Sequence, residues 1–505
     1  DTYSLHLDCA PLNIVRSRSS LSNIYAVRDY MDLVFPQMPA YSFIHRTLDF
    51  EYGNFSIPFC EDLKVRQSKS KDYKPSRYLL PCLLGKGERS RPNTWRQVLL
   101  SLSNRNFAAP SINESLDVEK VSNILFDSFL SCLKKDRYAE HFENILPDLN
   151  KIDLWLSTRD SRKYQNVLKN LNTTPWVDLI QDMKLMVKGD LKPKLDVGHF
   201  GKYSPPANII YFQHIINMFF SPIFLEIFGR ISYCLNDNII LFCGMNLNEL
   251  GNVVRSKLTQ PLDTYHFCEL DFSKFDKSQG HVIKLYEKLV YKFFNFSGNE
   301  YDNFALSEYF CNANASCGVN VDLFAQRRTG SPNTWLSNSI TTLAMLAHVY
   351  DFSTFDLVLV SGDDSLIFSK NPIPNKSCDL NEIFGMECKY LPNPTPYFCS
   401  KFIIQVGEEI RIVPDMVRLY EKLSNPISIF DKEHPTLLRE RFTSYRDLLE
   451  AYFDDNTYLV MDDYLSKRYN VPKFSGYAAF CFVHVLFSSV RNFTDLLYSS
   501  EEVLI

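Results

Sequence analysis

Two short apolar runs around a polar turn form the clearest pattern in the chain. Residues 357–369 read L-V-L-V-S-G-D-D-S-L-I-F-S. Runs of this length, rich in Val, Ile and Leu and separated by a turn signal, are typical of the two strands of a buried hairpin. The tip of that hairpin would carry the adjacent carboxyl groups of Asp363 and Asp364 between apolar arms.

Hydrophobic spacing predicts further elements along the chain. Helical spacing recurs at residues 115–135, 209–235, 282–293, 334–350 and 458–469. Two helices are expected within 209–235, because Pro222 near its middle cannot donate a helical hydrogen bond. Residues 265–271 predict a strand. The apolar run 474–490 contains polar residues and is short for a bilayer span, so it predicts a buried helix.

Polar residues follow the predicted strand and open one of the predicted helices. Asp271 would end the strand, and Asp276 would begin the next element. Thr334 and Asn338 are four residues apart and share one helix face. A polar helix face beside the loop marked by Gly330 suits hydrogen bonds to a sugar or a base. Helix capping is the alternative for Asp276 and Thr334.

The carboxylates at the hairpin tip predict a site for cations, because uncompensated buried charge is unfavourable. Magnesium suits such a site, since it prefers oxygen ligands and is commonly held by one or two carboxylates together with substrate phosphates. Asp271 facing Asp363 would complete the arrangement used in two-metal phosphoryl transfer. Two other aspartate pairs, at 454–455 and 462–463, lie in segments with helical spacing and are expected on solvated helix faces.

A basic segment precedes these elements. Residues 183–202 read M-K-L-M-V-K-G-D-L-K-P-K-L-D-V-G-H-F-G-K, where Pro193 disfavours a helix. In an extended chain Lys192 and Lys194 point to the same side. Their ammonium groups, with that of Lys188, could grip a triphosphate. An exposed strand edge that uses lysine to resist pairing is the alternative.

Composition narrows the setting. The 505 residues are 45% apolar and 22% charged, which is ordinary for a soluble globular protein long enough for several subdomains. The net charge of −5 means that any basic surface must be local. The 13 cysteines include no C-x-x-C pair, so a disulfide framework and a zinc ribbon are not expected and a reducing compartment fits. The first residue, Asp1, hints that the chain was released from, or continues, a longer product.

The order of three motifs resembles the A, B and C motifs of polymerases. They are D-F-S-K-F-D at 271–276, T-G-S-P-N-T-W-L-S-N at 329–338 and S-G-D-D at 361–364. The wording F-D-K-S-Q, Q-R-R-T-G and S-G-D-D-S-L-I-F is similar to that of viral RNA-dependent RNA polymerases of the alphavirus-like supergroup, and most like the closteroviruses of plants. F-G-M-E-C-K at 384–389, F-C-S-K at 398–401 and the basic segment resemble motifs D, E and F.

The resemblance implies a role for each motif residue. Asp271 and Asp363 would hold two magnesium ions, which Mn²⁺ could replace, with Asp364 assisting. Lys389 would protonate the leaving pyrophosphate. Contacts with the incoming nucleotide and its ribose are implied for Asp276, Asn338, Thr334, Lys188, Lys192 and Lys194. Contacts with template and primer are implied for Arg327, Arg328, Gly330, Ser331, Ser400 and Lys401.

The fold implied by the resemblance is α+β, a right hand with fingers, a palm of antiparallel sheet plus helices, and a helical thumb. The expected divisions are an N-terminal extension and fingers at 1–110, fingers with the basic motif at 111–260, a palm at 261–413 with a fingers insertion at about 295–325, and a helical thumb at 414–505.

The implied reaction is RNA-templated RNA synthesis by two-metal nucleotidyl transfer, which replicates and transcribes a positive-strand RNA virus genome. A reverse transcriptase is the nearest alternative, but its hairpin usually has a bulky residue where this chain has Ser361, and its sugar gate is aromatic. A catalytically silent RNA-binding scaffold is the second alternative. The expected partners are RNA template and primer, NTPs and a viral helicase and capping replicase protein. The expected location is the host cytoplasm, at membrane-associated replication complexes reached through those partners.

Overall fold

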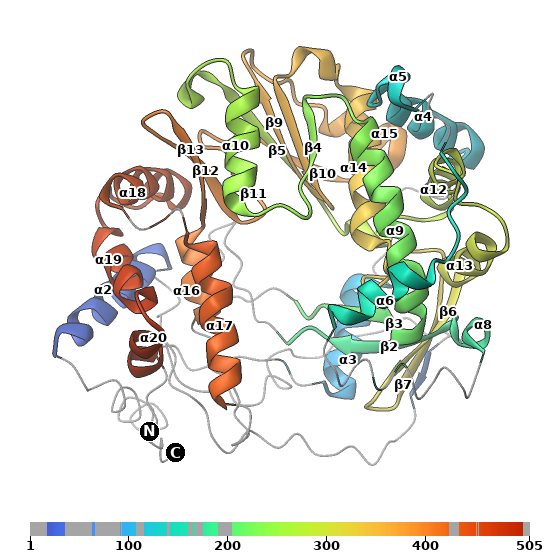
Figure 1. The fold of residues 1–505 in the computed structure, drawn as a ribbon, viewed down its shortest axis with the longest axis horizontal. Helices are drawn as coiled ribbons and strands as arrows, with labels where there is room; N and C mark the ends of the chain where they lie inside the picture. Colours follow the sequence, from blue (N-terminus) through green and yellow to red (C-terminus); the bar gives the residue numbers. More distant parts are fainter. Residues whose placement is uncertain are drawn as a thin grey trace.

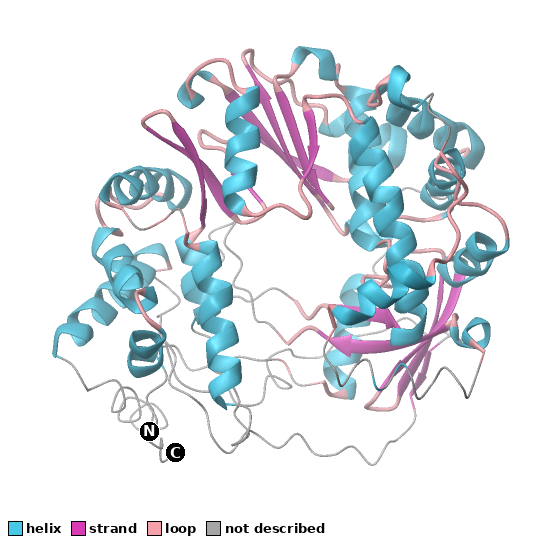
Figure 2. Cartoon of the chain, viewed as in Figure 1, coloured by secondary structure: helices cyan, strands magenta, loops and turns pink. Residues whose placement is uncertain are grey.

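The computed structural model describes residues 18–35, 63–65, 91, 93–107, 116–138, 142–159, 165, 167, 175–189, 205–423, 434–450, 452 and 454–497. Helices and strands are mixed, and the strands form three separate sheets with helices between them (Figure 2). The α+β class expected from the sequence is confirmed at this level.

A five-stranded sheet, here called the central sheet, has the strand order β10-β5-β9-β8-β4 (Figure 1). Its strands are β4 (Ile239–Leu241), β5 (His266–Phe272), β8 (Leu357–Ser361), β9 (Asp364–Ser369) and β10 (Cys388–Leu391). β4 pairs with β8 in parallel, and the other neighbours are antiparallel. The predicted hairpin is confirmed, because β8 and β9 pair down to Ser361 opposite Asp364.

The apolar runs of this hairpin are continuous because both faces of the central sheet are covered. Successive side chains of a strand point to opposite faces. Val358 and Ile367 accordingly belong to one hydrophobic core, and Leu359 and Leu366 belong to another. The first core includes α14 (Thr334–Val349), α12 (His281–Phe293) and α4 (Val118–Ser131), whereas the second includes α10 (Leu247–Lys257).

The segment 209–235 differs from its prediction of two helices. It begins with β3 (Asn208–Phe212) and continues as a single helix, α9 (His214–Cys234), with Pro222 inside it. Ten residues of α9 are buried, and their packing offsets the hydrogen bond that Pro222 cannot donate. By length and composition α9 could also cross a membrane, but half of its most apolar window is buried inside the protein, as in core helices.

A second five-stranded sheet, here called the lateral sheet, has the order β1-β7-β6-β2-β3. Besides β3 it contains β1 (Leu63–Val65), β2 (Asp182–Val187), β6 (Phe310–Ala315) and β7 (Val319–Phe324). β2 is the start of the basic segment, and its pairing with β6 is parallel. The hairpin of β6 and β7 therefore joins the expected fingers insertion to the strand that leads into the basic segment.

The C-terminal part consists of a small sheet and helices. The sheet contains β11 (Tyr397–Phe398), β12 (Lys401–Val406) and β13 (Glu409–Pro414). The helices are α16 (Met416–Leu423), α17 (His434–Leu448), α18 (Asp455–Tyr469), α19 (Tyr477–Phe487) and α20 (Val490–Leu497). α19 confirms the buried helix predicted for the run 474–490, because most of its side chains are buried.

The N-terminal helix α2 (Arg18–Val34) packs against these C-terminal helices, where the blue helix lies beside red α19 in Figure 1. Tyr30 contacts the rings of Tyr420 and Phe480 edge to face. This part of the segment 1–110 therefore packs on helices from the C-terminal end of the described chain. We call α2 and α16–α20 the C-terminal helical unit.

The other two aspartate pairs belong to the C-terminal helical unit, where they differ in exposure. Asp454 caps α18 by accepting a hydrogen bond from the Thr457 amide at 2.9 Å, and it pairs with Arg411. Asp462 is buried and accepts from the Gly476 amide at 3.0 Å. The prediction of a solvated face is wrong for Asp462, whereas the side chain of Asp454 is 41% exposed and Asp455 is exposed. Both aspartate pairs nevertheless lie outside the hairpin site, as expected, because they belong to the C-terminal helices.

The remaining described helices are short or lie on the periphery. They are α3 (Trp95–Arg105), α5 (Lys135–Tyr138), α6 (Leu149–Ser157), α8 (Trp176–Leu179), α11 (Phe275–Ser278), α13 (Asn299–Tyr309), α15 (Ser377–Phe384) and the 3-10 turns at Leu262–Thr264 and Phe352–Thr354.

Candidate active site

Three carboxylates meet at one end of the central sheet. Asp271 lies near the end of β5, Asp363 lies in the β8–β9 turn, and Asp364 begins β9. β5 and β9 pair with Glu269 opposite Leu366. Two residues further along, the same register brings Asp271 opposite Asp364. The structure thus brings together the three aspartates that were predicted as metal ligands.

The electrostatics of this cluster favour a cation. Asp363 is exposed at the hairpin tip, but partial desolvation by the protein atoms around its carboxyl is the main cause that raises its pKa to about 6. The negative charges of Asp364, Asp276 and Asp271 contribute to that rise in pKa. A bound cation would remove this like-charge penalty.

The donor set fits magnesium in an open site. Within the described ranges, no three Asp, Glu, His or Cys side chains form a group that could hold a metal ion without other ligands such as substrate phosphates and water. Magnesium often keeps several waters and takes further oxygens from substrate phosphates, so a few carboxylates on an open surface suffice for it.

Hydrogen bonds from α14 hold the hairpin tip, and the sequence analysis did not predict them. The Gly362 amide donates to Ser339 Oγ at 2.8 Å, and Thr342 Oγ1 donates to the Gly362 carbonyl at 3.0 Å. Trp335 Nε1 donates to Ser361 Oγ at 2.9 Å. The available signal was the run of hydroxyl and amide residues along an otherwise apolar helix. Gly362 has a φ of +66°, which places the turn in the left-handed region that glycine adopts readily.

Lys389 reaches the same end of the central sheet from β10. It lies directly opposite Asp271 in the antiparallel pair of β10 and β5. Opposed residues in such pairs point to the same face with Cβ atoms about 5 Å apart. The predicted general acid is thus beside a predicted metal ligand.

The predicted ribose-binding pair is also brought together. Asn338 Nδ2 donates to Asp276 Oδ1 at 3.1 Å. The other oxygen of Asp276 pairs with Arg105 from α3, which no sequence signal indicated. Asp276 lies inside α11, whose N-cap is Lys274, so the capping alternative does not apply to it. Thr334 instead uses its hydroxyl in the preceding loop, where it donates to the Arg328 carbonyl at 2.6 Å.

Arg327 and Arg328 were predicted to contact RNA, but both are buried. Arg327 is 2% exposed and pairs with Glu287 and Glu308. Arg328 is fully buried, and its guanidinium donates to the Leu323 carbonyl at 2.8 Å. Guanidinium groups bonded inside the protein cannot also contact RNA, so this prediction is corrected.

The loop between these arginines and α14 is fixed at both of its predicted template residues. The Gly330 amide donates to the Ile210 carbonyl at 2.8 Å, and a Cβ on Gly330 would collide with Tyr211 of β3. Ser331 is 7% exposed and donates to Asn333 Oδ1 at 2.7 Å. Its hydroxyl therefore faces the interior rather than a surface open to the template.

The remaining predicted residues lie around this end of the sheet or outside the described part. Lys401 is the first residue of β12, directly after the turn that follows β11, and it donates to the Cys399 carbonyl at 3.0 Å. The negative charge of Asp364 acts on its ammonium group. Burial lowers the pKa of its ammonium group. Ser400 is exposed in the same turn. Lys188 is exposed just after β2, whereas Lys192 and Lys194 lie outside the described residues.

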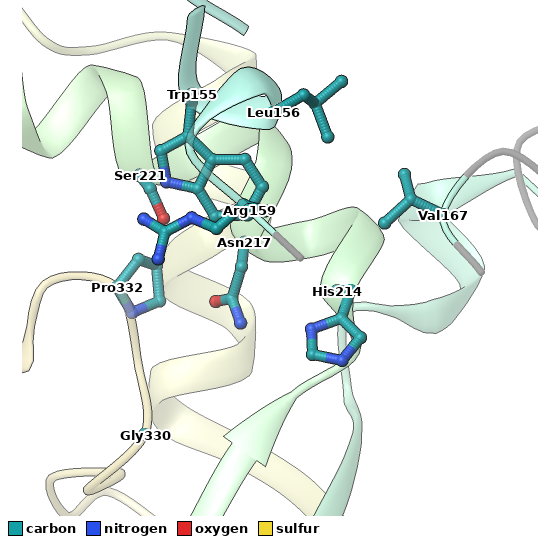
Figure 3. Close-up of a pocket in the computed structure, with 9 residues that line it drawn as sticks. All are labelled: Trp155, Leu156, Arg159, Val167, His214, Asn217, Ser221, Gly330 and Pro332. Atoms are coloured by element: carbon teal, nitrogen blue, oxygen red, sulfur yellow. The ribbon is translucent and has the colours of Figure 1, made fainter. Parts of the chain in front are cut away.

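A cavity of about 300 Å³ lies behind the loop at 330–332 (Figure 3). It is lined by residues of α6, α9 and that loop, including Trp155, Asn217 and Pro332. The Arg159 guanidinium lies over the Trp155 ring, 4.4 Å from its centroid. This cavity is separate from the carboxylate cluster, and no sequence pattern indicated it.

Comparison with known proteins identifies relatives over most of the chain. A family model described as RNA dependent RNA polymerase matches residues 52–496. Replicase polyprotein 1ab of Beet yellows virus is 34% identical over 387 residues, which are 76% of this chain and 12% of that protein. Replicase polyprotein 1ab of Grapevine leafroll-associated virus 3 is 30% identical over 493 residues, which are 94% of this chain and 17% of that protein.

A shorter relative matches a larger share of its own length. RNA-directed RNA polymerase 2a of Cowpea chlorotic mottle virus is 28% identical over 444 residues, which are 84% of this chain and 51% of that protein. The chain therefore spans about half of this relative and less than a fifth of either polyprotein.

Proposed function

The chain belongs to the RNA-dependent RNA polymerase family, and from that premise we propose that its central-sheet site extends an RNA primer on an RNA template. The resemblance to viral polymerases of the closterovirus type is confirmed by its relatives. The observation that carries the proposal is the convergence at one sheet end of Asp271, Asp363 and Asp364 with Lys389 and the Asp276–Asn338 pair.

The residues of the site divide the chemistry between them. Two magnesium ions held by Asp271 and Asp363, with Asp364 assisting, would activate the primer hydroxyl and neutralise charge that develops on the phosphates. Lys389, across the sheet from Asp271, is placed to give a proton to the leaving pyrophosphate. Lys401 at the start of β12 and Ser400 in the turn before it are suited to support the primer end.

We infer a right-hand arrangement from the sheets and helices. The central sheet with α14 forms the palm, the lateral sheet forms the fingers, and the C-terminal helical unit forms the thumb. This division keeps the palm at 261–413, apart from β4 at Ile239–Leu241, and the fingers insertion at about 295–325. It moves the described helix of the N-terminal segment, α2, to the thumb, since that helix packs there.

The partners and location follow from the same proposal. A relative from Raspberry bushy dwarf virus is named a methyltransferase/helicase/RNA-directed RNA polymerase. We propose that this chain likewise works with viral capping and helicase functions, on RNA and NTPs, and that it replicates and transcribes a positive-strand genome. Membrane-associated complexes in the host cytoplasm, reached through those partners, are the proposed location.

The alternatives fit the site less well. A reverse transcriptase would exclude the ribose hydroxyl, whereas the pair Asp276 and Asn338 can donate to it and accept from it. A silent scaffold would have no need for three carboxylates and a lysine at one sheet end.

Primer extension on a defined RNA template tests the proposal. Asp363→Asn and Asp271→Asn should fold but lose nearly all synthesis with Mg²⁺, because an amide is a poor substitute for a charged ligand. The matched control is Asp454→Asn, which changes an aspartate outside the site and keeps an N-cap residue, so synthesis should persist. Synthesis by Asp363→Asn together with failure of Asp454→Asn would show that the site is misplaced. Incorporation of dNTPs in preference to NTPs would favour the reverse transcriptase.

A further inference from the structure

A chain of buried hydrogen bonds runs from Arg327 to the ribose-binding pair. Arg327 Nε donates to Gln279 Oε1 at 3.0 Å, and Gln279 Nε2 donates to Asn338 Oδ1 at 2.9 Å. Asn338 Nδ2 then donates to Asp276 Oδ1 at 3.1 Å. Gln279 is fully buried, and Arg327 and Asn338 are 2% and 6% exposed, so water does not compete for the links between them.

The chemistry of the two ends fixes the direction of every bond between them. A guanidinium only donates, and an ionised carboxylate only accepts. Gln279 must therefore turn its oxygen to Arg327 and its NH₂ group to Asn338. Asn338 must in turn accept from Gln279 and direct its NH₂ group to Asp276. An amide flip at either residue would place like against like at both of its contacts.

The guanidinium that sets this direction is held firmly. Arg327 pairs with Glu287 and with Glu308, which also pair with Lys284. Burial lowers the pKa of Arg327 to about 9, which still leaves the group charged at neutral pH. The Arg327 amide also donates to the Asp276 carbonyl at 3.1 Å, so one residue anchors both the relay and the backbone beside the carboxylate.

We propose that Gln279 and Arg327 are positioning residues for sugar selection, which fix the Asn338 amide so that it offers an N–H to the ribose 2′-hydroxyl. This inference rests on the proposed function. The Asn338 NH₂ group has a second hydrogen beyond the one given to Asp276, and Asp276 can accept from the hydroxyl proton. A 2′-hydroxyl can accept a hydrogen bond from this second hydrogen of Asn338 and donate one to Asp276. A deoxyribose has no hydroxyl at this position and can make neither of these two hydrogen bonds.

Gln279→Glu tests the relay with almost no change of shape. The new carboxylate still accepts from Arg327 Nε, but it cannot donate to Asn338 Oδ1. The Asn338 amide is then expected to turn its NH₂ group toward the new carboxylate and its oxygen toward Asp276 and the sugar. The ratio of kcat/KM for GTP over dGTP should fall roughly tenfold or more. The dGTP value should stay close to that of the wild type, because the metal ligands are untouched.

Gln326→Glu is the matched control. Gln326 is also buried and precedes Arg327, but its side-chain oxygen accepts from Asn106 Nδ2 at 2.8 Å, a bond that a carboxylate keeps. Its GTP/dGTP ratio should remain that of the wild type. If Gln279→Glu does not fold, Gln279→Met removes the same donor without adding charge, and the same fall in the ratio is expected.

The outcomes separate the relay from the proposed function. An unchanged ratio in a folded Gln279 variant, or an equal loss for GTP and dGTP, overturns the relay. If the wild type makes no RNA or shows no preference for GTP, the proposed function itself fails. If Asn338→Ala loses the preference while both Gln279 variants keep it, the ribose-binding pair stands and the relay alone is rejected.

Discussion

At the scale of single residues, the charged side chains of the site differ in whether their partners lie near them in the chain or far from them. Asp363 and Asp364 could be placed at a hairpin tip because the apolar runs on either side define that tip. Arg327 looked like a basic loop residue, because the sequence around it does not reveal Glu287 and Glu308. Those partners lie 40 and 19 positions upstream in other helices, and no local pattern connects them.

Asn338→Ala tests the ribose-binding pair itself. Removing the amide leaves Asp276 without its Asn338 donor and removes the N–H expected to face the 2′-hydroxyl. The kcat/KM for an NTP should fall much more than the kcat/KM for its dNTP. The ratio of the two values should fall by an amount equivalent to about 1–3 kcal/mol. Competition between an NTP and its dNTP on one primer–template measures the ratio. A loss of thermal stability with the ratio unchanged would assign Asn338 to packing alone.

At the scale of elements, hydrophobic spacing located several long helices and the strands that carry or flank the three aspartates, but it did not show that a helix would continue through a proline. α12, α14 and α18 follow their predicted segments closely. Residues 209–212 were predicted to be helical because short apolar runs are ambiguous between helix and strand. α9 continues through Pro222 because its buried face packs against the core along its whole length. Tertiary packing of that kind is not readable from the local sequence.

Strand β10 brings Lys389 to the site, and Lys389→Leu tests what it does there. Loss of a general acid should slow nucleotide addition by roughly 10²–10⁴-fold with little change in NTP binding. The matched control is Lys370→Leu. Lys370 follows the far end of β9 and pairs with Asp356 at 2.9 Å on the surface, so addition should be unaffected. Pre-steady-state rates that are equal for Lys389→Leu and the wild type would remove Lys389 from the mechanism.

At the scale of the whole molecule, the order of the motifs predicted a palm between two other regions, but it did not predict how the chain closes on itself. A helical face such as that of α2 indicates that some partner covers it, without indicating which one. The structure supplies that partner from the opposite end of the chain. Val27, Tyr30 and Met31 share a hydrophobic core with α16 and α19. The first described helix, α2, and the last, α20, thus belong to the same helical unit.

This closure predicts that α2 stabilises the C-terminal helical unit. Tyr30 is 2% exposed between Tyr420 and Phe480, so Tyr30→Ala should leave a cavity and lower the free energy of unfolding by about 3 kcal/mol or more. Tyr25 on the same helix is 48% exposed, and Tyr25→Ala should cost less than about 1 kcal/mol. Tyr30→Phe keeps the ring contacts but removes the hydroxyl, so it shows how much of the stability comes from the ring and how much from the hydroxyl. Denaturant unfolding, with limited proteolysis of residues 416–497, measures the difference. Equal stability of the Tyr30→Ala and Tyr25→Ala proteins would mean that α2 does not support the helices against which it packs.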